Sequence, residues 1–226
     1  MKTILLSATE NQTVNQTRTS RLPLAVKLGF TAFMAVLVPI YWVNYGPTNF
    51  LYFCDVALFL TLIAVWTEHP LPASMAAVGI LIPQAGWVID FICGFAGFHP
   101  IGLTAYMFDS SKPLYARGLS LFHGWLPFML VYLVAKLGYD RRALKSWTLV
   151  AWTVMLISYF FLPGPTTTPP ADAPVNVNYV HGFSDTEPQK WMNPQLFFAT
   201  LMTALPLIVY LPTHLVLRRF APAASR

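Results

Sequence analysis

Charged side chains are scarce in this chain. Only 14 Lys and Arg and 9 Asp and Glu occur among its 226 residues, a charged fraction of 10 %, whereas 56 % of the residues are hydrophobic. The mean hydropathy is +0.54. A soluble domain carries about 25 % charged residues, so this composition excludes the soluble globular class and predicts a polytopic membrane protein.

Cysteine, internal repeats and strand-like alternation are also scarce or missing. The two cysteines, Cys54 and Cys93, lie inside apolar runs without metal-type spacing, as small apolar filler would. No run alternates with the period of a half-buried strand, and no repeat of roughly 20 to 50 residues is present. These features predict an all-α fold, and we expect no metal and no cofactor.

Apolar runs long enough to cross a bilayer occur six times. A span needs about 20 residues to cross ~30 Å of hydrocarbon. The six predicted transmembrane helices cover residues 24–45, 49–67, 72–97, 115–138, 143–163 and 194–217. We therefore expect a polar N-terminal tail at 1–22 that is not cleaved as a signal, one membrane domain at 23–218, and a C-terminal tail at 219–226.

The basic residues are distributed unevenly between the two sides of such a membrane domain. One side receives both tails and the loops near Glu68 and Asp140, with 11 of the 14 Lys and Arg; the other side receives Lys112, Arg117 and Lys190. Cytoplasmic loops carry the excess of basic residues, so both termini are predicted to be cytoplasmic and the protein to lie in the plasma (inner) membrane. The net charge of +5 then reflects topology, and we expect no nucleic-acid partner.

Two features interrupt this regular pattern. The outer loop at 164–193 is much longer than a helix connection requires; its first half is an extended Pro- and Thr-rich spacer, and its second half is either a lid or an ordinary solvated loop. Prolines lie inside several spans, where each leaves the carbonyl four residues earlier without its helical partner. They include Pro83, Pro127, Pro206 and Pro212.

Ionisable residues recur at one depth on three predicted spans. At 1.5 Å per residue, Asp55, Asp90 and His123 lie roughly 9 to 12 Å inside the outer ends of their spans. Intramembrane charges usually face the bundle interior and mark function. Helical spacing adds neighbours on the same faces: Asn49 and Tyr52 with Asp55, Gln84 and Trp87 with Asp90, and Arg117 and Ser120 with His123. We predict a common pocket that opens outward, with Asn178 and His181 of the outer loop placed to cover it.

These polar residues allow two interpretations. In the first, a hydrogen-bonded network with Asp90 paired to Arg117 only holds helices together. In the second, His123 acts as a general base that Asp55 orients. A nucleophile is then required, and the spacing does not choose among three candidates, which are Ser120, Cys54 and Tyr52.

Two short segments resemble a known family. The segment from Asn49 to Asp55 is similar to the F-L-T-F-x-D segment of the androgen-induced membrane hydrolases, which cleave fatty-acid esters of hydroxy fatty acids, and the segment from Phe122 to Leu130 is similar to that family's histidine-containing helix. A more distant resemblance extends to bacterial integral membrane proteins and related transmembrane acyltransferases, through Asn178 and the tyrosine that follows it. The resemblance implies a six-span fold with a histidine base, but Tyr52 occupies the position of the family's threonine nucleophile.

Three functions follow as alternatives. The first is a membrane-embedded hydrolase or acyltransferase that acts on a lipid or fatty-acid ester, with Asn178 positioning an oxyanion or the lid. The second is a protein that binds or transports a lipid or another apolar small molecule without catalysis. The third is a metal-dependent enzyme that uses His123, His181, Asp55 and Asp90.

Overall fold

The computed structural model describes residues 21–168, 170 and 173–224. Over these residues it is helical, with no strand and one isolated bridge between Tyr139 and Ala223. The all-α prediction is thereby confirmed for the described chain. The N-terminal tail lies outside the described residues apart from its last two positions, and so do the final two residues of the C-terminal tail.

The helical elements follow the predicted runs closely. In chain order they are α1 (Leu24–Tyr45), the 3₁₀ helix η1 (Pro47–Leu51), α2 (Phe53–Thr67), α3 (Pro70–Gly94), α4 (Ala105–Phe108), α5 (Leu114–Ser120), α6 (Phe122–Leu137), α7 (Ala143–Phe161), the 3₁₀ turn η2 (Val177–Tyr179), α8 (Pro194–Ala204), the π-helical η3 (Leu205–Tyr210) and α9 (Leu211–Phe220).

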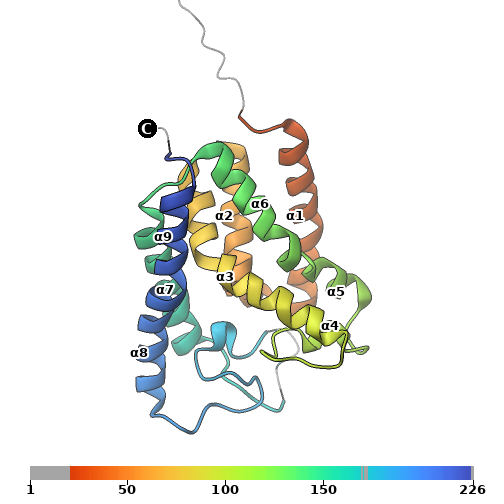
Figure 1. The fold of residues 1–226 in the computed structure, drawn as a ribbon. Helices are drawn as coiled ribbons and strands as arrows, with labels where there is room; N and C mark the ends of the chain where they lie inside the picture. The colour runs from red at the N-terminus through yellow and green to blue at the C-terminus, as the bar shows by residue number, and fades with distance from the viewer. Residues whose placement is uncertain (1–20, 169, 171–172, 225–226) are drawn as a thin grey trace, which may run out of the picture.

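The helices run up and down between two ends of the molecule (Figure 1). One end, which we call the terminal end, carries the first and last described residues and the short links α2–α3 and α6–α7. The other, the loop end, carries the long connections 95–113 and 162–193. Short links of a few residues force neighbouring helices to be antiparallel, and this arrangement brings both ends of the chain to the same side.

Helix α3 forms the centre of the bundle and packs against α2, α6 and α7. Its residues from Ala73 to Ile80 are all buried, and most of them are small. Small side chains let membrane helices approach closely. The closest approach is at Gly79, where an added Cβ would lie 2.0 Å from the fully buried ring of Trp147 on α7.

Five described helical segments are long and apolar enough to cross a membrane, by length and composition. They are Leu24–Tyr45, Pro70–Gly94, Leu114–Leu137, Ala143–Phe161 and Pro194–Phe220. The run predicted at 49–67 forms a shorter α-helix of 15 residues, because η1 occupies its start and the extended Tyr52 separates η1 from α2. Asn49, Tyr52 and Asp55 therefore do not lie on one continuous α-helix.

The last segment contains the π-helical stretch η3, which includes Pro206 and is followed by Pro212 in α9. Pro206 has no amide hydrogen to donate to the carbonyl of Met202, four residues earlier. The indole Nε1 of Trp152 on α7 donates to that carbonyl instead, at 2.8 Å. The carbonyl that the proline leaves without its helical partner therefore forms a hydrogen bond between α7 and the last segment.

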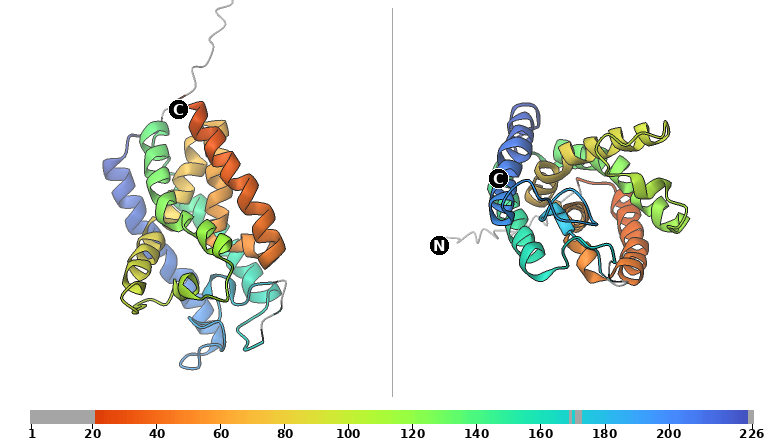
Figure 2. Two further views of the ribbon diagram at one scale, coloured as in Figure 1. Left: turned by 90° about the vertical axis from the view of Figure 1, so that its right-hand side faces the viewer. Right: turned by 90° about the horizontal axis from the view of Figure 1, so that it is seen from below.

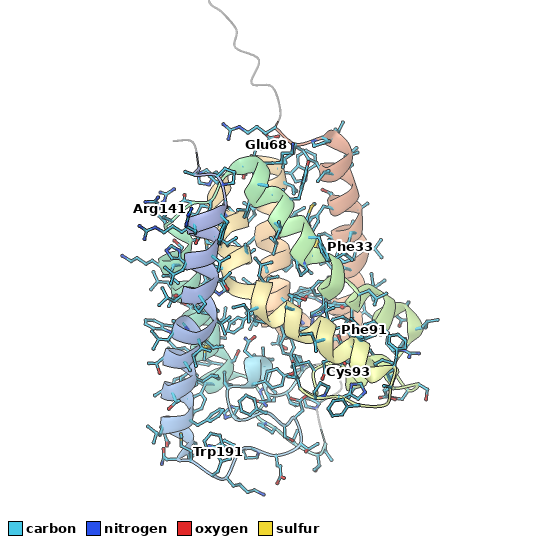
Figure 3. All side chains as sticks on the ribbon, in the orientation of Figure 1. Phe33, Glu68, Phe91, Cys93, Arg141 and Trp191 are labelled. Atoms are coloured by element: carbon cyan, nitrogen blue, oxygen red, sulfur yellow. The ribbon has the colours of Figure 1, made fainter. Side chains whose placement is uncertain are left out.

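Large apolar side chains cover much of the outer surface. Val43, Phe128 and Phe161 are each more than three-quarters exposed, a pattern that suits contact with lipid tails. Figure 3 shows Glu68 and Arg141 at the terminal end and Trp191 at the loop end. Glu68 forms an ion pair with Lys27, with Oε1 and Nζ 2.7 Å apart, and this contact joins the start of α1 to the α2–α3 link.

Candidate functional site

Asp55 lies in the first turn of α2, facing the bundle interior, and is 3 % exposed. Its Oδ2 accepts hydrogen bonds from the Asn49 amide at 3.4 Å and the Cys54 thiol at 3.7 Å. Its Oδ1 is buried and accepts no hydrogen bond from the described residues. A buried polar atom without a partner costs about 1–3 kcal/mol or more, so this oxygen marks an unsatisfied point in an otherwise packed region.

Ser120 organises the neighbouring side chains at the junction of α5 and α6. Its hydroxyl exchanges a hydrogen bond of 2.9 Å with Tyr41 of α1 and lies 3.2 Å from the carbonyl of Ala116. Tyr106 interacts with the same hydroxyl and accepts from the indole of Trp87 at 3.3 Å. Asp55 lies close enough to Tyr41 to interact with it electrostatically. We call Tyr41, Asp55, Tyr106, Ser120 and His123 the polar layer.

The imidazole of His123 is held in one tautomer. Its Nδ1 lies 2.8 Å from the carbonyl oxygen of Ser120; because a carbonyl only accepts, Nδ1 carries the hydrogen of the neutral ring and Nε2 carries the lone pair. The ring stacks on Trp87, with centroids 4.9 Å apart, and on Phe122, at 4.0 Å. Ser120 thus makes the orienting contact expected from Asp55.

No candidate nucleophile pairs with this histidine in the described chain. The nitrogen that faces Ser120 bonds the carbonyl of that residue and not its hydroxyl. The Cys54 thiol points to Asp55, and the Tyr52 hydroxyl reaches the carbonyl of Val175 in the outer loop at 3.5 Å. The chain therefore presents a tautomer suited to a base without a hydroxyl or thiol hydrogen-bonded to it.

Asp90 is fully buried but belongs to a different environment. Its carboxylate accepts hydrogen bonds from the backbone amides of Ile101, Gly102 and Thr104, at 2.7 to 3.0 Å, and from the Thr104 hydroxyl at 2.7 Å. His99 approaches it at 3.7 Å. Asp90 thus fixes the connection after α3, and in the described chain no hydrogen bond joins its carboxylate to Asp55 or His123.

The remaining predicted members of the α3 and α5 faces also have their own surroundings. Arg117 donates to the carbonyl of Met107 at 3.0 Å, which corrects the proposed pairing with Asp90. Gln84 is 2 % exposed, and its Oε1 accepts no hydrogen bond from the described residues. Among these residues no three His, Cys, Asp or Glu side chains gather as a metal site would require, so the metal-enzyme alternative has no support.

The second half of the outer loop folds back against the helices. Seen from the loop end, η2 lies near the middle of the ring of helices (Figure 2, right). Asn178 accepts from the amide of Phe53 at 3.0 Å and donates to the carbonyl of Leu51 at 2.9 Å. We call these two bonds the Asn178 latch. They use the oxygen and one N–H of the side-chain amide, so Asn178 positions the loop.

The loop holds an unusual backbone conformation to make these contacts. Asn176, Asn178 and Tyr179 all have φ between 50° and 59°, the left-handed region, which costs roughly 1–2 kcal/mol for a residue other than glycine. Asn176 offsets this cost through its side chain, which bonds the carbonyls of Gly182 and Ser184 and the amide of His181.

Tyr179 and His181, on the docked face of the loop, are neutral near neutral pH. Burial raises the pKa of Tyr179 to about 12 and lowers the pKa of His181 below its usual value. His181 stacks on Tyr159 of α7, with centroids 4.8 Å apart. A neutral, stacked His181 fits a packing contact between the loop and α7.

Two members of the polar layer were not expected from the sequence. Tyr41 continues the buried stripe of Phe30, Met34 and Leu37 on α1, and that spacing is the only signal that its ring turns inward. Tyr106 lies on the four-residue α4, which is too short to show a period, so nothing in the sequence pointed to it.

No protein-family model matches this chain, and no curated protein or solved structure matches it. The class of protein to which this chain belongs is therefore defined by its composition and fold alone. Its long apolar helices are those of an integral membrane protein with transmembrane helices.

Proposed function

We propose that the protein crosses the plasma (inner) membrane six times, with α2 as the sixth span and both termini cytoplasmic. The 15 residues of α2 rise ~22 Å and the five of η1 add ~10 Å, close to the ~30 Å that a span requires. The basic residues support the orientation, because eight of the described ones belong to the terminal end. They are Arg21, Lys27, Lys136, Arg141, Arg142, Lys145, Arg218 and Arg219.

Within this topology, the polar layer binds the neutral, hydroxyl-bearing head group of a lipid or similar apolar molecule. The observation that carries this proposal is the buried, unpartnered Oδ1 of Asp55. Asp55 interacts electrostatically with Tyr41, whose hydroxyl bonds the Ser120 hydroxyl, and Tyr106 interacts with the same serine. The layer offers acceptors and hydroxyl groups but no Lys or Arg, so a hydroxyl donor suits it better than an anion. Monoacylglycerol is the simplest lipid with this chemistry.

A photoreactive, alkyne-tagged monoacylglycerol tests binding to the purified full-length protein. We expect labelling that unlabelled monoacylglycerol competes away and that Asp55→Val reduces by about tenfold, the effect of losing one strong hydrogen bond. Ser158→Ala is the matched control, because it removes another buried oxygen that has no hydrogen-bond partner in the described chain, at a position outside the layer. Equal labelling of the Asp55→Val variant and the wild type would refute the proposed site.

Hydrolysis of a fatty-acid ester is the second candidate, and the fixed tautomer of His123 favours it. With no side-chain hydroxyl hydrogen-bonded to Nε2, the nucleophile would be water activated by that nitrogen. This differs from the threonine nucleophile that the resemblance to the androgen-induced membrane hydrolases implies.

Fatty-acid release from the same monoacylglycerol separates the two candidates. If the wild type releases fatty acid and His123→Gln does not, while both bind the photoreactive probe equally, the protein is a hydrolase. If neither releases fatty acid above the rate of empty detergent micelles, the binding function stands and the hydrolase is excluded for this ester.

A further inference from the structure

A second polar group without a charged partner lies outside the polar layer, at the loop end. Arg117 is half-buried, and no carboxylate of the described residues lies within ion-pairing distance of it. One guanidinium nitrogen donates to the carbonyl of Met107, and its Nε is buried with no hydrogen-bond partner in the described chain. An arginine has five N–H donors in a planar fork, and most of them are unused here.

Arg117 lies in the wall of an open groove of about 330 Å³ between α3, α4 and α5. The groove is otherwise apolar. Three of its side chains, Phe91, Phe95 and Phe108, pack on one another with ring centroids 5.1 to 5.6 Å apart, and Figure 3 shows Phe91 near the loop end of α3. A groove of this size lies at the lower end of the range for ligand sites.

We propose that this groove binds one anionic phospholipid of the surrounding bilayer. Its phosphate would accept from the guanidinium of Arg117, and the upper part of one acyl chain would lie along the three phenylalanines. Charge complementarity carries the proposal, because arginine pairs readily with phosphate in two-point contacts and the cation has no partner acid. The exposed Phe95 and Leu114 border the groove, as expected for a site entered from lipid.

The nearby charges do not replace this ligand. Asp109 interacts with Arg117 only at longer range, and its carboxylate is held by the amide and hydroxyl of Ser111 at 2.9 and 2.8 Å. Lys112 is exposed beside it and adds a second positive charge to the same end. The local field at the groove therefore favours an anion.

Gly118 supplies a way to close the groove without disturbing the fold. It borders the groove, and a Cβ added to it meets no atom within 4 Å. Gly118→Leu therefore fills the space that the acyl chain would occupy, while Arg117 stays in place. Gly29→Leu is the matched control, since that helical glycine is equally open but lies on α1, away from the groove.

Native mass spectrometry of the full-length protein, titrated with dioleoyl phosphatidylglycerol, tests the proposal. We expect Arg117→Gln and Gly118→Leu each to weaken binding about tenfold or more, and Lys112→Gln and Gly29→Leu to change it less than threefold. Dioleoyl phosphatidylcholine, which carries no net charge, should bind the wild type about tenfold more weakly than phosphatidylglycerol.

Three results would overturn the proposal. They are equal binding of the two phospholipids by the wild type, binding by Gly118→Leu equal to that of Gly29→Leu, and binding of oleate as tight as that of phosphatidylglycerol, which would make the occupant a free fatty acid. Because the variants leave Asp55 unchanged, failure here is distinguishable from failure of the monoacylglycerol experiment.

Discussion

The Asn178 latch decides whether the outer loop stays docked over the loop end of the bundle. Asn178→Ala removes two hydrogen bonds, each contributing a net ~1 kcal/mol. It also places alanine at φ 59°, which adds roughly 1 kcal/mol of backbone strain. The total of about 3 kcal/mol corresponds to a change of roughly 100-fold in the equilibrium between docked and open loop.

Two further substitutions separate the contributions. Asn178→Gly loses both bonds but adopts the left-handed conformation freely, so opening should rise by about 30-fold. Asn178→Asp keeps the acceptor for the amide of Phe53 and loses the donor to Leu51, so loop opening should rise by about fivefold.

Amide hydrogen exchange measures this opening directly. The protected amides are those of Asn176, Tyr179 and Gly182, which bond Pro163, Asn176 and Tyr179 respectively, and α7 is the internal reference. If Asn178→Ala leaves exchange at 176–182 unchanged, burial of Val177 and Val180 holds the loop, and the latch argument is wrong.

Two predictions concern the packing and the terminal end. Gly79→Ala should destabilise the protein by about 3 kcal/mol, the upper end for overpacking, because the added Cβ would lie 2.0 Å from Trp147. Thermal unfolding measures this change, and the control Gly29→Ala should be neutral or stabilising. A Gly79→Ala variant as stable as the wild type would contradict the prediction. The hydrogen bonds from Arg142 hold the pKa of Asp140 below its usual value, so its contribution to stability is present above about pH 4 and is lost as the pH falls through the folded-state pKa. Asp140→Asn should lower the stability by less than about 1 kcal/mol at neutral pH, since Arg142 is largely exposed. In thermal unfolding from about pH 2 to 5, the variant should lack the loss of stability that protonation of Asp140 causes in the wild type. An unchanged dependence of stability on pH would contradict this role of Asp140.

The helices themselves were predictable from the sequence. Hydrophobic runs and short polar links reflect the local need to bury backbone polar groups inside helices, so the ends of the observed helices lie within a few residues of the predicted runs. The exception is 49–52, where the 3₁₀ helix η1 ends and Tyr52 is extended; Gly46, with φ 73°, precedes η1. The length of the apolar run concealed this break, because hydropathy records side chains and not backbone conformation.

The inward orientation of Gln84 and Trp87 could also be predicted, since helical spacing assigns residues to faces, and that of Asp55 could be predicted from the cost of a charge in contact with lipid. All three are buried. Helical spacing could not, however, predict which groups these side chains bond. Asp90 satisfies its carboxylate with amides 11 to 14 residues further along the chain, within a connection that has no period to read.

The sequence by itself determined that this chain is helical, apolar and divided unequally in basic charge between its two ends, because each of these properties is a sum over local residues. Tertiary structure alone decided that Ser120 orients His123, that Tyr41 and Tyr106 meet at Ser120, and that Asn178 holds α2 from more than 120 residues away. Hydrogen bonds are directional and short, so they depend on how the helices pack, which no single helix encodes.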